Sequence, residues 1–189
     1  MSKLILEPTA QALWHRALRE ASGAAGRPLD DVLEAYLLMV LMRFTHRPEI
    51  LRTIMAREYL EGMQLTGRVR EERLRDVGDQ CLILAGLFPG LARRRRVSTA
   101  YFVDLGRGAY GELAARLAQS AGELYRQLTA AFVMLMDVLH ALRGSHALEA
   151  LTPLEHWELW ESVGSRTART ALAGSGEALP VAAGAPGVH

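Results

Sequence analysis

The 189-residue chain contains little cysteine, little lysine and little excess charge. Cys81 is the only cysteine, so the chain can form neither an internal disulfide nor a metal site built from several cysteines. Residues 1–8 lack the apolar stretch of a signal peptide, and apolar runs such as 35–42 are far shorter than the ~20 residues that a membrane-spanning helix needs. These absences predict a cytoplasmic protein that does not enter a membrane.

The basic residues are unusual in kind rather than in number. Lys3 is the only lysine among the 22 basic residues, and the formal net charge is +1. Proteins that coat nucleic acids usually carry a large basic excess, because their affinity comes mostly from neutralising phosphates. The composition therefore excludes a general nucleic-acid coat protein and leaves only a local basic patch open.

What the chain does contain is typical of one globular domain. Half of its residues are hydrophobic and 23% are charged. Apolar residues recur at helical spacing in almost every segment, which predicts an all-α, single-domain bundle of six or seven helices over residues 1–170. Residues 171–189 are rich in glycine, alanine and proline without apolar periodicity, so we expect a disordered tail there.

Several helices have boundaries that can be expected from the sequence. A helix from Leu29 to Phe44 is apolar around most of its circumference, which is typical of a buried helix. Apolar residues from Leu117 to Leu142 alternate spacings of four and three, a heptad pattern that predicts one long helix over about Ala109–Arg143, or two nearly collinear helices broken near Gly122. Further helices are expected at 10–21, at 49–64 and from Gly67 to Phe88.

Two segments carry sharper local signals. Thr152-Pro153-Leu154-Glu155 forms a capping box with proline at the first helical position, which predicts a short last helix. In Ser98–Leu105, β-branched and aromatic residues make helix and strand hard to distinguish, and both remain open.

The segment Gly106-Arg107-Gly108-Ala109-Tyr110-Gly111 matches the GxGxxG fingerprint of dinucleotide-binding proteins. In that interpretation the glycines approach a pyrophosphate, and Asp137 binds the ribose. However, Asp137 lies further away than the usual ~20 residues, and no other strands are expected to form a parallel sheet. We therefore favour a helix junction whose glycines permit close packing, and we expect no cofactor.

Metal-binding and nucleophilic residues are sparse. Asp137 and His140 lie three residues apart on one helix face, as do His146 and Glu149, but the chain contains no Glu-x-x-His motif of the kind that di-metal bundles use. We therefore expect no metal site, with Asp137 and His140 as the weak candidates and His140 as a partly buried histidine. Cys81 lies in an apolar run, where a thiol packs as a small hydrophobic group.

Two polar features remain. Asp79 precedes the apolar half of its helix, so if it faces inward it needs an arginine or other donors, and Arg75, one turn back, is the local candidate for a structural pair. Arg93, Arg94, Arg95 and Arg96 form the densest charge in the chain and are expected in a surface loop. With Arg107 downstream and further arginines at 68–75, they are candidates for binding nucleic acid or an acidic partner.

The middle of the chain resembles uncharacterised all-helical bacterial proteins. The resemblance covers Leu74–Leu113 and is carried by Val77-Gly78-Asp79-Gln80-Cys81-Leu82, Leu87-Phe88-Pro89, Arg95-Arg96-Val97-Ser98, Tyr101-Phe102 and Gly106-Arg107-Gly108-Ala109-Tyr110. It implies a helical, cytoplasmic protein and no particular activity, ligand or catalytic residue.

These patterns lead to three functional hypotheses. The first is a non-enzymatic binding or regulatory protein that self-associates, because the methionine-rich helix at 29–44 offers surplus apolar surface. The second is binding of nucleic acid or an acidic partner through Arg93–Arg96. The third is a helical metal-dependent enzyme that uses Asp137 and His140.

Overall fold

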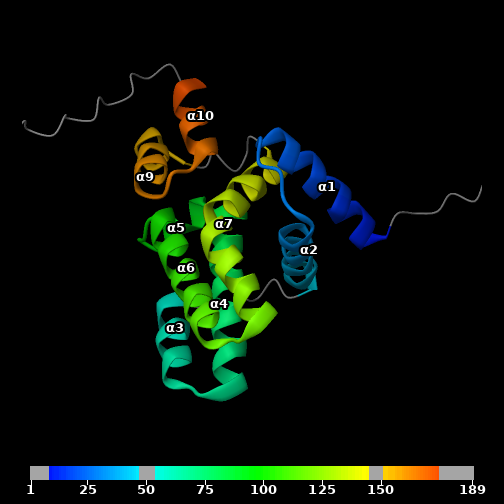
Figure 1. Ribbon diagram of the computed structural model, residues 1–189. Helices are drawn as coiled ribbons and strands as arrows, with labels where there is room; N and C mark the ends of the chain where they lie inside the picture. The colour runs from blue at the N-terminus through cyan, green and yellow to red at the C-terminus, as the bar shows by residue number, and fades with distance from the viewer. Residues whose placement is uncertain (1–8, 47–53, 145–150, 175–189) are drawn as a thin grey trace, which may run out of the picture.

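A computed structural model describes residues 9–46, 54–144 and 151–174. These residues form helices and contain no strand, so the expected all-α bundle is confirmed (Figure 1). None of the described helices is both long and apolar enough to cross a membrane. The described part contains nine helices rather than six or seven: α1 (Ala10–Ala24), α2 (Asp31–His46), α3 (Met55–Gln64), α4 (Gly67–Leu87), α5 (Gly90–Arg94), α6 (Thr99–Arg116), α7 (Gln119–Arg143), α9 (Pro153–Val163) and α10 (Arg166–Gly174).

Helices α4, α6 and α7 form the centre of the bundle (Figure 1). The first half of α4 is charged and its second half, from Val77 to Leu87, is buried without interruption. Cys81 lies within this buried half, as its apolar surroundings predicted. The largest fully buried side chains come mainly from these three helices, and they include Leu82, Leu84, Phe102, Tyr110 and Phe132. Burial of such side chains from water is the main stabilising contribution to a bundle of this kind.

The long helix starts later than the expected Ala109, whereas its end at Arg143 and the heptad pattern from Leu117 to Leu142 match α7. The chain leaves the helical conformation at Leu117 and Ala118, so α6 and α7 are separate helices that run side by side in opposite directions (Figure 1). Gln119 has a positive φ of 53° at this reversal. A Cβ atom on Gly122 would overlap the carbonyl oxygen of Leu117, so only glycine fits there. The break thus lies before Gly122, and the two helices are not collinear.

Helix α2 is buried on one face rather than all round. Its inner face contributes Leu33, Tyr36, Leu37, Val40 and Leu41 to the core, next to α1 and α7. On its outer face Val32 and Met39 are exposed to 51% and 44%. Within the described residues, nothing covers this outer face.

The structure also shows where the other helices begin and end, including the segment for which helix and strand both remained open. Residues 99–105 are helical and belong to α6, whose Ser98 side chain accepts a hydrogen bond from the backbone N–H of Tyr101. The capping box predicted at Thr152–Glu155 is confirmed as the start of α9. Helix α10 was not expected, and it continues to Gly174, into the segment assigned to the tail. Residues 47–53, which include the expected start of the third helix, and residues 175–189 lie outside the described residues.

Candidate functional site

Asp79 is the centre of a buried polar cluster that joins three helices. Its side chain is on α4, and the residue is only 4% exposed. The hydroxyl groups of Tyr36 on α2 and Tyr110 on α6 both donate to Oδ1, at 2.6 and 2.8 Å. Arg43 on α2 donates to Oδ2 from Nη1 at 3.0 Å, and its Nη2 donates to Asp76. The arginine that pairs with Asp79 is therefore Arg43.

Arg75 was expected in that role, and the structure corrects this. Its closest carboxylate is that of Asp76, at 3.9 Å, and its side chain is about 40% exposed. Arg75 and Asp79 are four residues apart on the same side of α4, but the Arg75 side chain is partly exposed and lies nearer to Asp76. The groups that bind the Asp79 carboxylate come instead from α2 and α6.

The environment of Asp79 favours a structural role. Burial raises the pKa of its carboxyl group, while the bonds from Tyr36, Tyr110 and Arg43 act in the opposite direction. Burial and the nearby carboxylate raise the pKa of Tyr36 and of Tyr110 well above the usual value, so both phenols remain hydrogen-bond donors. The rings of Tyr36 and Tyr110 pack edge to face, with centroids 6.1 Å apart.

Asp137 forms a second buried polar centre, at the end of α7 that meets α10. The residue is 0% exposed. Its Oδ1 lies 2.6 Å from the hydroxyl oxygen of Ser165 and 2.8 Å from that of Thr167. Its Oδ2 accepts bonds from the backbone N–H of Arg166 at 3.0 Å and from Nη2 of Arg27 at 3.3 Å. Three of these donors belong to residues 165–167 at the start of α10, so Asp137 holds that helix against α7.

His140 lies one turn further along α7 and is also 0% exposed. Its Nε2 is 3.0 Å from the carbonyl oxygen of Ala85 and its Nδ1 is 2.9 Å from the hydroxyl oxygen of Thr167. Burial lowers the pKa of His140, which favours the neutral ring. Because a carbonyl only accepts, Nε2 carries the proton, and the single hydroxyl proton of Thr167 is shared between Nδ1 and Asp137.

Asp137 and His140, the two weak metal candidates, thus lie close together, but their side-chain atoms are hydrogen-bonded to protein groups. Within the described ranges, no group of three or more histidine, cysteine or acidic side chains is positioned to hold a metal ion. Asp137 and His140 are bound instead by Ser165, Thr167 and a backbone carbonyl. The other expected pair, His146 and Glu149, lies outside the described residues.

The GxGxxG segment lies inside α6, so the dinucleotide-binding interpretation is wrong. A strand would have to precede the glycines in that motif, and here a helix does. A Cβ atom on Gly106 would lie 2.5 Å from the ring of Phe132 and 2.9 Å from the Cβ of Cys81. Gly106 lets α6 approach α4 and α7 closely, as expected, but the segment lies in the interior of one helix and is not the helix junction that we expected. Burial also raises the pKa of the Cys81 thiol, which disfavours the reactive thiolate.

The arginine cluster is only partly a loop, and one of its four members is paired with an acidic residue. Arg93 and Arg94 form the last turn of α5, while Arg95 and Arg96 follow it. Arg93 is held by Glu155 of α9, to which its Nε and Nη2 donate at 3.1 and 2.6 Å. Arg107 is exposed on α6.

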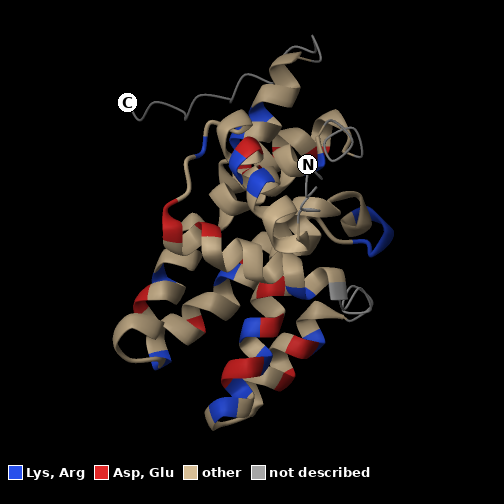
Figure 2. Ribbon diagram, turned by 90° about the vertical axis from the view of Figure 1, so that its right-hand side faces the viewer, with Lys and Arg blue, Asp and Glu red and all other residues tan. Residues whose placement is uncertain are grey.

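The arginines upstream on α4 are largely neutralised. Arg68 pairs with Glu72 on the same helix, and Arg70 pairs with Glu112 on α6. Figure 2 shows acidic and basic residues interleaved along the hairpin of α3 and α4. Arg68 and Arg70 therefore add little uncompensated positive charge to Arg93–Arg96.

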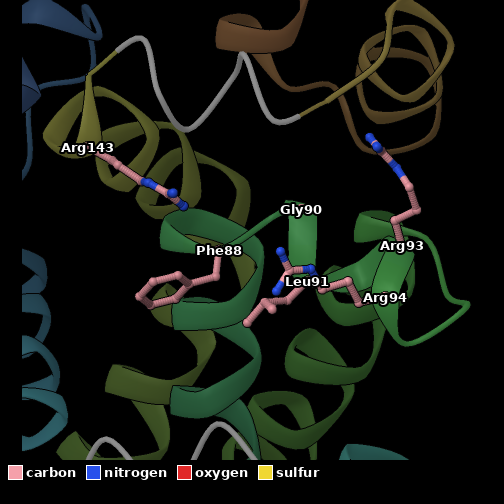
Figure 3. A pocket seen from close by; sticks show the side chains of 6 residues that line it. All are labelled: Phe88, Gly90, Leu91, Arg93, Arg94 and Arg143. Carbon is pink, nitrogen blue, oxygen red and sulfur yellow. The ribbon is translucent and has the colours of Figure 1, made fainter.

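A cleft of about 510 Å³ lies where α4 ends, beside α5 and the end of α7 (Figure 3). Arg143, which the sequence analysis did not single out, lines it from α7. Its only sequence signal is its place in the last turn of a helix, where a cation suits the dipole. The cleft is lined by Phe88, Gly90, Leu91, Arg93, Arg94 and Arg143.

No family model, no curated protein and no solved structure matches the chain. The function must therefore be inferred from the geometry of these residues.

Proposed function

We propose that this protein is a non-enzymatic binding protein that self-associates through the outer face of α2. The observation that carries this proposal is the exposure of Val32 and Met39, at 51% and 44%, on a helix whose opposite face is already in the core. Ala35 is also exposed and lies between them on the same face. An amphipathic helix at the surface of a monomer normally presents polar residues there.

A second copy of the chain is the partner that this face fits best. The three side chains run large, small, large along the helix. In an antiparallel pair of α2 helices related by a two-fold axis, Ala35 meets Ala35 at the crossing, and Val32 of each copy packs against Met39 of the other. The small alanine permits a close approach of the two helices, and the flexible methionine adapts to the valine.

The strength of such a dimer can be bounded. Stable interfaces bury about 800 Å² on each partner, and a single exposed stripe of a 16-residue helix offers less than that. We therefore expect a reversible monomer–dimer equilibrium, with a dissociation constant in the micromolar range.

Sedimentation velocity from about 1 to about 100 µM tests the proposal. The average mass should rise with concentration, and Met39→Glu should abolish the rise because it places two charges in the apolar contact. Leu60→Glu is the matched control, since Leu60 is 62% exposed on α3, away from α2. A monomer over the whole range, or an equal effect of both variants, contradicts the proposal.

The two alternative functions have less support. A metal-dependent enzyme would need Asp137 and His140 to have free ligand atoms, and both are bound by protein groups in the interior. Binding of nucleic acid would need several unpaired cations on one surface, whereas Arg93 is paired with Glu155. With Arg93 paired, the short remaining segment 94–96 is better suited to binding a small anion than a nucleic-acid polymer.

A further inference from the structure

We propose that the cleft between α4, α5 and α7 binds a small phosphomonoester that has an apolar or aromatic body. The inference goes beyond self-association, because the cleft is separate from the outer face of α2. It stands on the positions of two arginines and on the apolar residues between them (Figure 3).

The three arginines at the cleft differ in what already binds them. Arg93 also lines the cleft, but its guanidinium group extends toward α9 and forms two bonds with Glu155 (Figure 3). Arg94 has no carboxylate partner among the described residues, and its side chain is exposed. Two cationic side chains, Arg94 and Arg143, are therefore left to meet an anion.

Arg143 is held in position without being neutralised. It donates to the carbonyl oxygen of Leu87, and its guanidinium carbon lies 5.4 Å from the centroid of the Phe88 ring. Both contacts fix the side chain at the end of α7 and leave its positive charge uncompensated among the described residues. A guanidinium that is already oriented loses less entropy when it binds an anion.

The arrangement favours a phosphomonoester over a singly charged group. A phosphomonoester carries a charge of about −1.5 to −2 near pH 7, which matches two guanidinium groups. Arg94 comes from α5 and Arg143 from α7, so the two side chains approach the cleft from different sides (Figure 3). The oxygens of a tetrahedral phosphate point in different directions, so we expect such a group to accept from both arginines. Phe88 and Leu91 supply an apolar wall for the rest of the ligand, and a volume of about 510 Å³ suits a small molecule.

Titration with phenyl phosphate, followed by ³¹P NMR and by calorimetry, tests the proposal. We expect phenyl phosphate to bind more tightly than inorganic phosphate, because only the former uses the apolar wall, and phenol not to bind. Arg94→Ala should weaken binding about tenfold, since a charge-assisted hydrogen bond is lost. Arg94 is exposed with no partner among the described residues, so this variant should fold like the parent.

The matched control is Arg107→Ala, which removes the same charge from an exposed position on α6 outside the cleft. It should leave the affinity unchanged, and Arg143→Lys should weaken binding while the melting temperature is followed as a check of folding. Absence of phenyl phosphate binding overturns the proposal. Equal losses in Arg94→Ala and Arg107→Ala also overturn it, because the anion would then follow the general positive field, as a nucleic acid does.

Discussion

Removal of either phenol from Asp79 should destabilise the fold in a way that depends on pH. Tyr36→Phe and Tyr110→Phe each delete one donor to the same carboxylate oxygen, at 2.6 and 2.8 Å, and keep the aromatic ring in the core. A hydrogen bond to a charged group contributes about 1.5–3 kcal/mol. We expect each variant to lose that amount of unfolding free energy near neutral pH.

The dependence on pH follows from the raised pKa of Asp79. A carboxyl group whose folded-state pKa lies above the unfolded value of 3.8 favours the folded state most when it is protonated, and this contribution is lost as the pH rises through the folded-state pKa. Because the two phenols lower that pKa, deleting one raises it further. The loss should therefore be largest near neutral pH and should shrink as the pH falls toward 4.

Urea denaturation at two pH values, followed by circular dichroism, measures these free energies. In the double variant we expect the loss of unfolding free energy to be smaller than the sum of the two single losses. The reason is that Asp79 can take up a proton instead of remaining charged without hydroxyl donors. Tyr59→Phe, at a half-buried position on α3, is the matched control and should change stability by less than about 0.5 kcal/mol. A loss below that limit in Tyr110→Phe, or an equal loss at both pH values, would refute the reasoning.

Three further predictions concern other sites. The bond from Arg93 lowers the pKa of Glu155 to about 2, so the stabilisation from this pair should be present above pH 4.5 and be lost as the pH falls toward 2. In Glu155→Gln, the unfolding free energy measured over this range should depend less on pH. Burial lowers the pKa of His140 from 6.5, so stability should also fall below pH 6.5, less steeply in His140→Gln; an unchanged slope would contradict its burial as a neutral ring. Gly106→Ala should cost about 1–3 kcal/mol in thermal denaturation because the new Cβ meets the core, whereas Gly111→Ala, which has open space, should be neutral or stabilising.

Features set by neighbouring residues could be predicted from the sequence. The helical period gave the fold class, and the charged and apolar halves of α4 are visible as composition along one segment. The capping box of α9 was predictable to the residue, because Thr152 and Glu155 satisfy each other's backbone N–H groups within one turn. In each case the physical cause lies within a few residues of its effect.

Features that depend on residues far apart in the sequence could not be predicted. The reversal between α6 and α7 was missed because neither glycine nor proline marks it: the chain turns at Leu117 and Ala118, and Leu117 also fits the heptad spacing of α7. The partners of Asp79 come from 31, 36 and 43 residues away, and no local rule selects Arg43 over Arg75. Helix α10 was missed because it buries only Ala168 and Leu172, too few to show a period.

The same helix illustrates a consequence of bonds formed across the bundle. Two of the first backbone N–H groups of α10 are bound by side chains before its first turn is complete: Ala168 by the hydroxyl of Ser165, and Arg166 by Asp137 on α7. A nine-residue helix is too short to persist alone in water. We expect α10 to form only after α7 presents Asp137, so its amide protons should exchange with solvent in one cooperative step when that contact opens.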